Sequence, residues 1–161
     1  MLKELIEEII DRLGWIGGLR YIAEDWGQLD YEQPPVQWPC ALIDMQEVRC
    51  SQIGAGGLLC ECEFSIQIAQ RAPQRVSANA PDRLKDESLA FSAIIDRIFL
   101  KIHAEESENH SPFVLRDIRK VKEPDIQSYI LSFATQFKIA KPQITAPLTG
   151  FHVRPKPSGK A

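Results

Sequence analysis

The sequence lacks the features by which catalytic, cofactor-binding and membrane-spanning proteins are usually recognised. Its 161 residues contain no nucleophile elbow, no glycine fingerprint that opens a helix after a strand, and no apolar run long enough to span a membrane. The 3 histidines fall on a predicted helix end, an acidic loop and the C-terminal region, with no nucleophile or paired carboxylate nearby in sequence. We therefore expect a protein that is not an enzyme, has no catalytic, cofactor or metal site, and does not contact a membrane.

A secretory leader and disulfide bonds are not expected either. Residues 2–13 mix acidic side chains with apolar ones, which is incompatible with the core of a signal peptide. A cytoplasmic chain normally keeps its cysteines reduced, so we interpret Cys40, Cys50, Cys60 and Cys62 as free thiols. Cys60 and Cys62 share one face of a predicted strand, but structural zinc usually needs four ligands. Small buried apolar residues are the better interpretation.

Two long alternating patterns predict the scaffold of the fold. In the first, the apolar positions are Leu58, Cys60, Cys62, Phe64, Ile66 and Ile68. In the second they are Tyr129, Leu131, Phe133, Phe137 and Ile139, with Thr135 as the polar member of that face. Each pattern is typical of a strand with one buried face. We expect Phe64, Ile66, Leu131 and Phe133 to lie in the core, against the apolar stripe of a helix.

Two helical patterns supply a cover for this sheet. Apolar stripes predict one helix over residues 2–14 and a second that has Pro81 in its first turn and carries its stripe to residue 102. The remaining predicted elements are strands at residues 19–23, 41–48 and 113–122, a glycine-rich hairpin connection at 52–57, and a long loop at 24–39 pinned by its aromatic residues. The fold class is therefore α+β: a mainly antiparallel sheet of four to five strands with two amphipathic helices packed on one face. We expect a single domain at residues 1–140 and an extended, proline-rich tail at 141–161.

Charge is divided unevenly along the chain. Residues 1–112 hold 10 lysines and arginines against 19 acids, whereas residues 113–161 hold 9 against 3. The two parts should attract each other, within one subunit or between neighbouring copies. We select Arg116, Lys120 and Lys122 as candidates for one side of a subunit interface. The other side would be formed by the acids of the first helix or by the long loop, with Glu24 and Trp26 as its candidates.

The same basic residues leave nucleic-acid binding open as an alternative function. On a regular strand Arg116, Lys120 and Lys122 would share one face and Arg119 would point to the other. The nearby aromatic residues follow the core pattern and are not placed to stack on bases. A solvated strand face or a protein contact is therefore favoured over a nucleic-acid site.

Two stretches of the chain resemble the N-terminal region of phage tail terminator, or tail-completion, proteins: YIAEDWGQLD from Tyr21 to Asp30 and PPVQWPCALI from Pro34 to Ile43. The resemblance implies a sheet flanked by helices and a head-to-tail ring, commonly a hexamer. It implies a role in ending tail-tube growth and presenting a surface to the head connector, so the partners would be tail-tube and head-connector proteins. The location would be the cytoplasm of the bacterial host during assembly and then the tail of the virion. No catalytic motif belongs to this family.

Overall fold

The computed structural model describes residues 2–54, 56–72, 81–103 and 107–140, so the predicted tail at 141–161 lies outside the described residues. The elements are α1 (Leu2–Gly14), β1 (Tyr21–Glu24), a 3-10 turn η1 (Gln28–Asp30), β2 (Cys40–Ile53), β3 (Gly57–Arg71), α2 (Asp82–Ile102), β4 (Val114–Lys122) and β5 (Ile126–Ala140). The sheet order is β1-β2-β3-β5-β4. β1 runs parallel to β2, and the other pairs are antiparallel. The predicted α+β class, with a mainly antiparallel sheet and two helices, is confirmed.

The core lies between the helices and one face of the sheet. Phe64 pairs with Phe133 and Ile66 with Leu131 across β3 and β5, and all four side chains are buried, as predicted. The Phe64 ring stacks on Phe133 with centroids 5.3 Å apart and meets Phe113 edge-on at 5.2 Å. The helices complete this cluster with Leu5, Ile9 and Leu13 from α1 and Phe91, Ile94, Ile95, Ile98 and Ile102 from α2. The alternating apolar residues of the strands and the apolar stripes of the two helices therefore pack together in one core.

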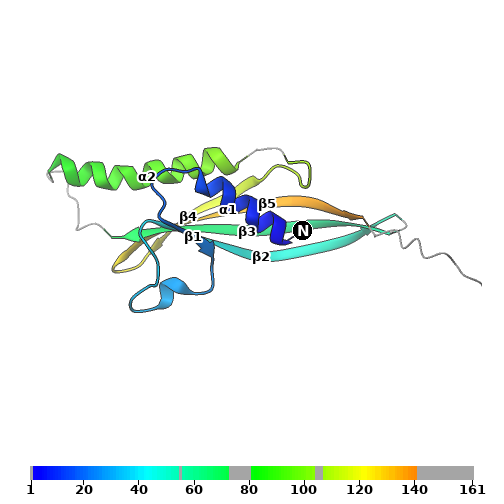
Figure 1. Cartoon of the computed structure of the whole chain (residues 1–161), viewed down its shortest axis with the longest axis horizontal. Helices are drawn as coiled ribbons and strands as arrows, with labels where there is room; N and C mark the ends of the chain where they lie inside the picture. The colour runs from blue at the N-terminus through cyan, green and yellow to red at the C-terminus, as the bar shows by residue number, and fades with distance from the viewer. Residues whose placement is uncertain (1, 55, 73–80, 104–106, 141–161) are drawn as a thin grey trace, which may run out of the picture.

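The loop between β1 and β2 lies on the other face of the sheet, away from α2 (Figure 1). Cys40 and Leu42 point to this face by alternation and are fully buried. Gln28 is also fully buried, and its side chain accepts a hydrogen bond from the Trp26 N–H at 2.8 Å and donates one to the Glu24 carbonyl at 2.7 Å. The loop is thus anchored by a satisfied polar side chain. The predicted aromatic anchor is wrong for Trp26, which is 58% exposed.

The β2–β3 hairpin is longer than the sequence pattern indicated. We expected a strand at residues 41–48 and a connection at 52–57, but β2 continues to Ile53 and pairs with β3 up to Gly57. The second half of β2 is exposed on both faces, so it has no apolar alternation to reveal it. The turn itself uses Gly54 and Gly56, whose φ values of 60° and 147° favour glycine.

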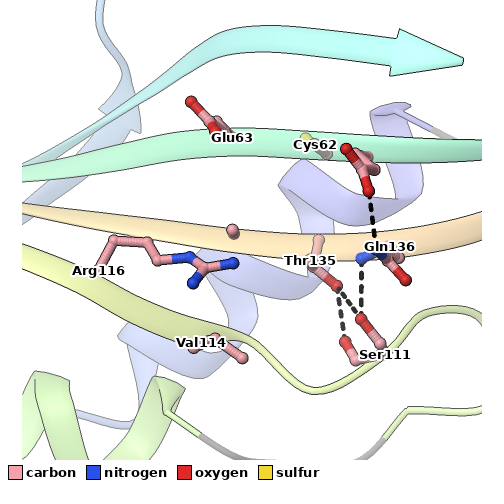
Figure 2. Close-up of a pocket in the computed structure, with 9 residues that line it drawn as sticks. Cys62, Glu63, Ser111, Val114, Arg116, Thr135 and Gln136 are labelled. Carbon is pink, nitrogen blue, oxygen red and sulfur yellow. Dashed lines mark hydrogen bonds between the residues drawn. The ribbon is translucent and has the colours of Figure 1, made fainter.

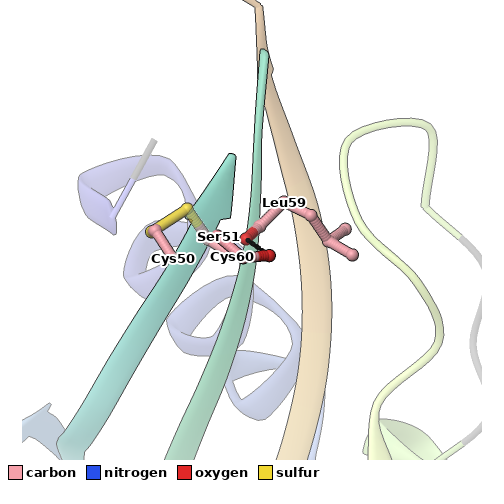
Figure 3. Close-up of a disulfide and its surroundings, with 4 residues drawn as sticks. All are labelled: Cys50, Ser51, Leu59 and Cys60. Atoms are coloured by element: carbon pink, nitrogen blue, oxygen red, sulfur yellow. Dashed lines mark hydrogen bonds between the residues drawn. A yellow bond between two sulfur atoms is a disulfide. The ribbon is translucent and has the colours of Figure 1, made fainter. Parts of the chain in front are cut away.

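One pair of cysteines corrects the prediction that all four are free. Cys50 and Cys60 are directly opposite in the β2–β3 register, with Cα atoms 4.0 Å apart, and their sulfur atoms are bonded (Figure 3). Directly opposite residues of an antiparallel pair can bring their side chains close enough for a disulfide bond. Cys40 and Cys62 are free and buried. Burial raises the pKa of each of these two thiols to about 11.

Candidate subunit interface

The residues selected from the sequence lie at the two opposite edges of the sheet. Glu24 is the last residue of β1 and Trp26 follows it, whereas Arg116, Lys120 and Lys122 all belong to β4. Because β1 and β4 are the outermost strands, these two groups cannot contact each other across the sheet of one subunit. All five residues are exposed. The edges are therefore available to different surfaces of neighbouring molecules.

The basic edge is divided by an irregularity in β4. The register shifts between Leu115 and Asp117, so Leu115 pairs with Phe133 on the helix-bearing face while Asp117 pairs with Ser132 on the other face. Because a bulge contains one extra residue, each later side chain of the strand points to the face opposite to the one it would have on a regular strand. Lys120 therefore shares the helix-bearing face with its partner Tyr129, and its Nζ lies 5.7 Å from the centre of the Tyr129 ring.

Arg116 belongs to the opposite face. Figure 2 shows its side chain beside β4, on the side of the sheet turned away from the helices. The prediction that Arg116, Lys120 and Lys122 share one face is thus wrong, because a regular strand was assumed where the chain has a bulge. Lys120 and Lys122 remain on one face, and Arg119 points to the other as expected.

Arg116 lines a shallow cavity of about 280 Å³ on this open face of the sheet. The cavity is also bordered by Glu61 and Glu63 of β3 and by Ser111 and Gln136. Gln136 Nε2 donates a hydrogen bond to Glu61 at 3.0 Å, and the Gln136 backbone N–H donates one to Ser111 Oγ at 2.8 Å (Figure 2). Carboxylates and a guanidinium side by side can recognise a charged partner surface by paired hydrogen bonds.

The acidic character of this face extends to β2. Glu47 is the β2 partner of Glu63, and Arg49 is the partner of Glu61. Arg49 donates two hydrogen bonds to the Glu47 carboxylate, at 2.8 and 2.7 Å, and these bonds lower the pKa of Glu47. Sequence reasoning did not select these residues, although the odd positions of the β3 pattern already placed Glu61 and Glu63 on one face.

The β1 edge has a different chemistry. The Trp26 and Tyr31 rings meet edge-on, with centroids 5.8 Å apart, and each residue is 58% exposed. Gly27 turns the chain here with a φ of 88°, and its N–H donates to the Asp25 carboxylate at 2.9 Å. Exposed aromatic side chains held by a fixed turn are characteristic of the energetic centres of protein interfaces.

His110 forms a separate buried network at the helix-bearing face. Its Nε2 lies 3.0 Å from a Glu8 carboxylate oxygen, and its Nδ1 lies 2.7 Å from the Ser111 carbonyl oxygen. Glu8 also accepts a hydrogen bond from Arg12, so the network ties α1 to the segment before β4. Both ring nitrogens have partners within the protein, which fix the orientation of the His110 ring.

In the described part of the chain, no group of three or more histidine, cysteine or acidic residues is placed to hold a metal ion. Within the same ranges, no helix has the length and apolar character needed to cross a membrane.

Comparison with known proteins reveals a likeness of fold. No protein-family model and no curated protein sequence matches the chain. Among solved structures, a chain from the virion of a native gene transfer agent particle is similar, with a TM-score of 0.52 and 9% sequence identity. The match covers 81% of this chain and 84% of that one. At this identity the likeness establishes a shared fold.

Proposed function

We propose that this chain is a structural subunit of a phage-type particle: a tail terminator that caps the tail tube and helps to join it to the head connector. The observation that supports it most directly is an open sheet with unlike edges, in a fold shared with a virion chain. On this proposal the protein is not an enzyme and needs no cofactor. It would assemble in the cytoplasm of a bacterial host and remain in the virion tail.

The two edges favour a head-to-tail contact. One edge presents Lys120 and Lys122, and the other presents Glu24 beside the Trp26–Tyr31 pair. When a basic edge meets an acidic and aromatic edge, each subunit uses both surfaces. A rotation of 60° between neighbours would close such a contact into a hexameric ring, as we propose. Exposed ion pairs contribute only about 0 to 1 kcal/mol each, so the aromatic contact must supply most of the affinity.

Light scattering over a concentration series, with and without purified tail tubes, tests the proposal directly. We expect rings on tube ends, visible by electron microscopy, and about tenfold weaker capping by a Lys120→Glu/Lys122→Glu variant.

Trp26→Ala should weaken capping by about 30-fold or more, as at an interface hot spot. Lys138→Glu, an exposed charge on β5 away from both edges, is the matched control and should cap normally. A compact two-fold dimer under all conditions would contradict the ring.

Nucleic-acid binding is the alternative, and the geometry supports it less well. The bulge in β4 places Arg116 and Arg119 on one face and Lys120 and Lys122 on the other, so these side chains do not form a single basic surface. If the alternative held, affinity for DNA or RNA would fall steeply as the salt concentration rose.

A further inference from the structure

A groove of about 850 Å³ lies where the β1–β2 loop approaches the β4–β5 turn. It is bordered by Tyr31, Glu32, Pro34, Trp38, Arg71, Ala72, Glu123, Pro124, Asp125 and Ile126. The Ala72 N–H donates a hydrogen bond to the Asp125 carbonyl at 2.9 Å and fixes the turn to the end of β3. The groove is therefore built from three segments that are far apart in sequence and meet at one end of the sheet.

The lining has two chemical characters. Tyr31 and Trp38, together with two prolines, supply flat apolar surface, and the Tyr31 ring meets the Trp26 ring edge-on. Three carboxylates, from Glu32, Glu123 and Asp125, lie around this surface, with Arg71 as the one cation of the lining. Aromatic grooves of this kind bind proline-rich segments in the polyproline II conformation, and surrounding acids select basic ones.

The C-terminal sequence of this chain has the complementary composition. Residues 141–161 contain four prolines and four lysines or arginines, without a single acid. Their densest stretch is Arg154-Pro155-Lys156-Pro157, in which cations alternate with prolines. Proline rings of such a stretch can pack on aromatic side chains, and its cations can pair with carboxylates.

The length of the chain matches the distance to be covered. β5 begins at the groove with Ile126 and ends at Ala140, so the two ends of the strand are about 46 Å apart at about 3.3 Å per residue. Ala140 lies 14 residues after Ile126, and Arg154 lies 14 residues after Ala140. An extended segment of that length spans about 43 to 50 Å. The cation–proline stretch is thus the part of the tail that reaches the groove.

We propose that residues 154–160 of this chain dock in the groove formed by Tyr31, Trp38, Glu123 and Asp125. Prolines 155 and 157 lie on the two aromatic rings, and Arg154 and Lys156 pair with the carboxylates of the β4–β5 turn. This inference does not require a ring or a tail tube, because it concerns contacts that the isolated protein can make.

Site-directed photocrosslinking of the full-length protein tests the proposal. Benzoylphenylalanine replaces Tyr31 in the groove, or Trp15, which is 79% exposed and does not line it, as the matched control. After irradiation, mass spectrometry should find crosslinks to residues 151–161 from position 31 and none from position 15. A mixture of ¹⁴N- and ¹⁵N-labelled protein shows whether the tail comes from the same chain, as proposed, or only from a second copy, which would overturn docking within one chain.

Charge variants make the test specific. Glu123→Lys/Asp125→Lys should lower the crosslink yield from position 31 by about three- to tenfold, whereas Glu108→Lys, an exposed acid outside the groove, should leave it unchanged. In the tail, Lys156→Glu should lower the yield and Lys141→Glu should not.

Circular dichroism of each variant checks that the fold is kept. Absence of tail crosslinks from position 31, or a yield that is insensitive to the groove charges, would overturn the proposal. Since no tail tube is present, failure here leaves the proposed function untouched.

Discussion

Removal of the Phe133 ring tests how the core is assembled. Phe133 is 1% exposed, lies opposite Phe64 in the β3–β5 register and stacks on its ring. Phe133→Ala leaves a cavity between the sheet and the helices, because neither layer can collapse without moving the other. Buried phenylalanine to alanine changes cost about 3 to 5 kcal/mol, which is a large share of the 5 to 15 kcal/mol typical of a domain.

Chemical and thermal unfolding, followed by circular dichroism, measure this loss. For a chain of this length each kcal/mol shifts the melting temperature by about 2 to 4 °C, so we expect a decrease of about 6 to 20 °C. Ile118→Ala is the control: Ile118 lies opposite Leu131 on the same face but is 48% exposed, and its truncation should cost about 1 kcal/mol. A loss for Phe133→Ala no larger than that for Ile118→Ala would refute the central position of the phenylalanine stack.

Two further predictions concern the cysteines. Cys40 and Cys62 have a folded-state pKa raised to about 11 by burial, from an ordinary value of 9.0. The stability that depends on these neutral thiols is therefore present below pH 9 and is lost as the pH rises to 11, by up to about 3 kcal/mol for each thiol. A pH series of unfolding curves in which Cys62→Ala shows the same alkaline loss as the wild type would disprove this. Reduction of the Cys50–Cys60 bond, which closes a loop over a sequence separation of 10, should lower the free energy of unfolding by about 2 to 3 kcal/mol. Cys50→Ser should make stability independent of reductant, and an unchanged response to reductant would contradict the assignment.

The parts of the fold that bury one face were accessible from the sequence. The positions from Cys60 to Ile68 and from Leu131 to Phe137 alternate because one side of each strand faces the helices, and the helix stripes carry the matching signal. The second half of β2 gave no such signal because both of its faces are exposed. Its pairing depends on β3, which is a tertiary interaction and not a local preference.

The candidate site was only partly predictable for the same reason. Selecting Glu24 and Lys120 from the charge distribution identified residues that the fold places at opposite edges. The face of Arg116 depended on a bulge, and the Cys50–Cys60 bond depended on exact register, neither of which a single sequence reveals. The groove at Trp38 requires three distant segments to converge, so it becomes visible only in three dimensions.

The short β1 and the interrupted β4 have a consequence for the handling of the free protein. An open sheet exposes backbone donors and acceptors at each end, and unprotected edges of this kind recruit further strands into fibrous aggregates. Here β1 covers only Cys40–Ile43 of β2, and no described strand pairs with the outer side of β2 from Asp44 to Ile53. The other edge combines a bulge with Arg116, Arg119, Lys120 and Lys122, which are recognised protections against strand addition. Strand addition to the free protein should therefore occur at the outer side of β2 and not at β4.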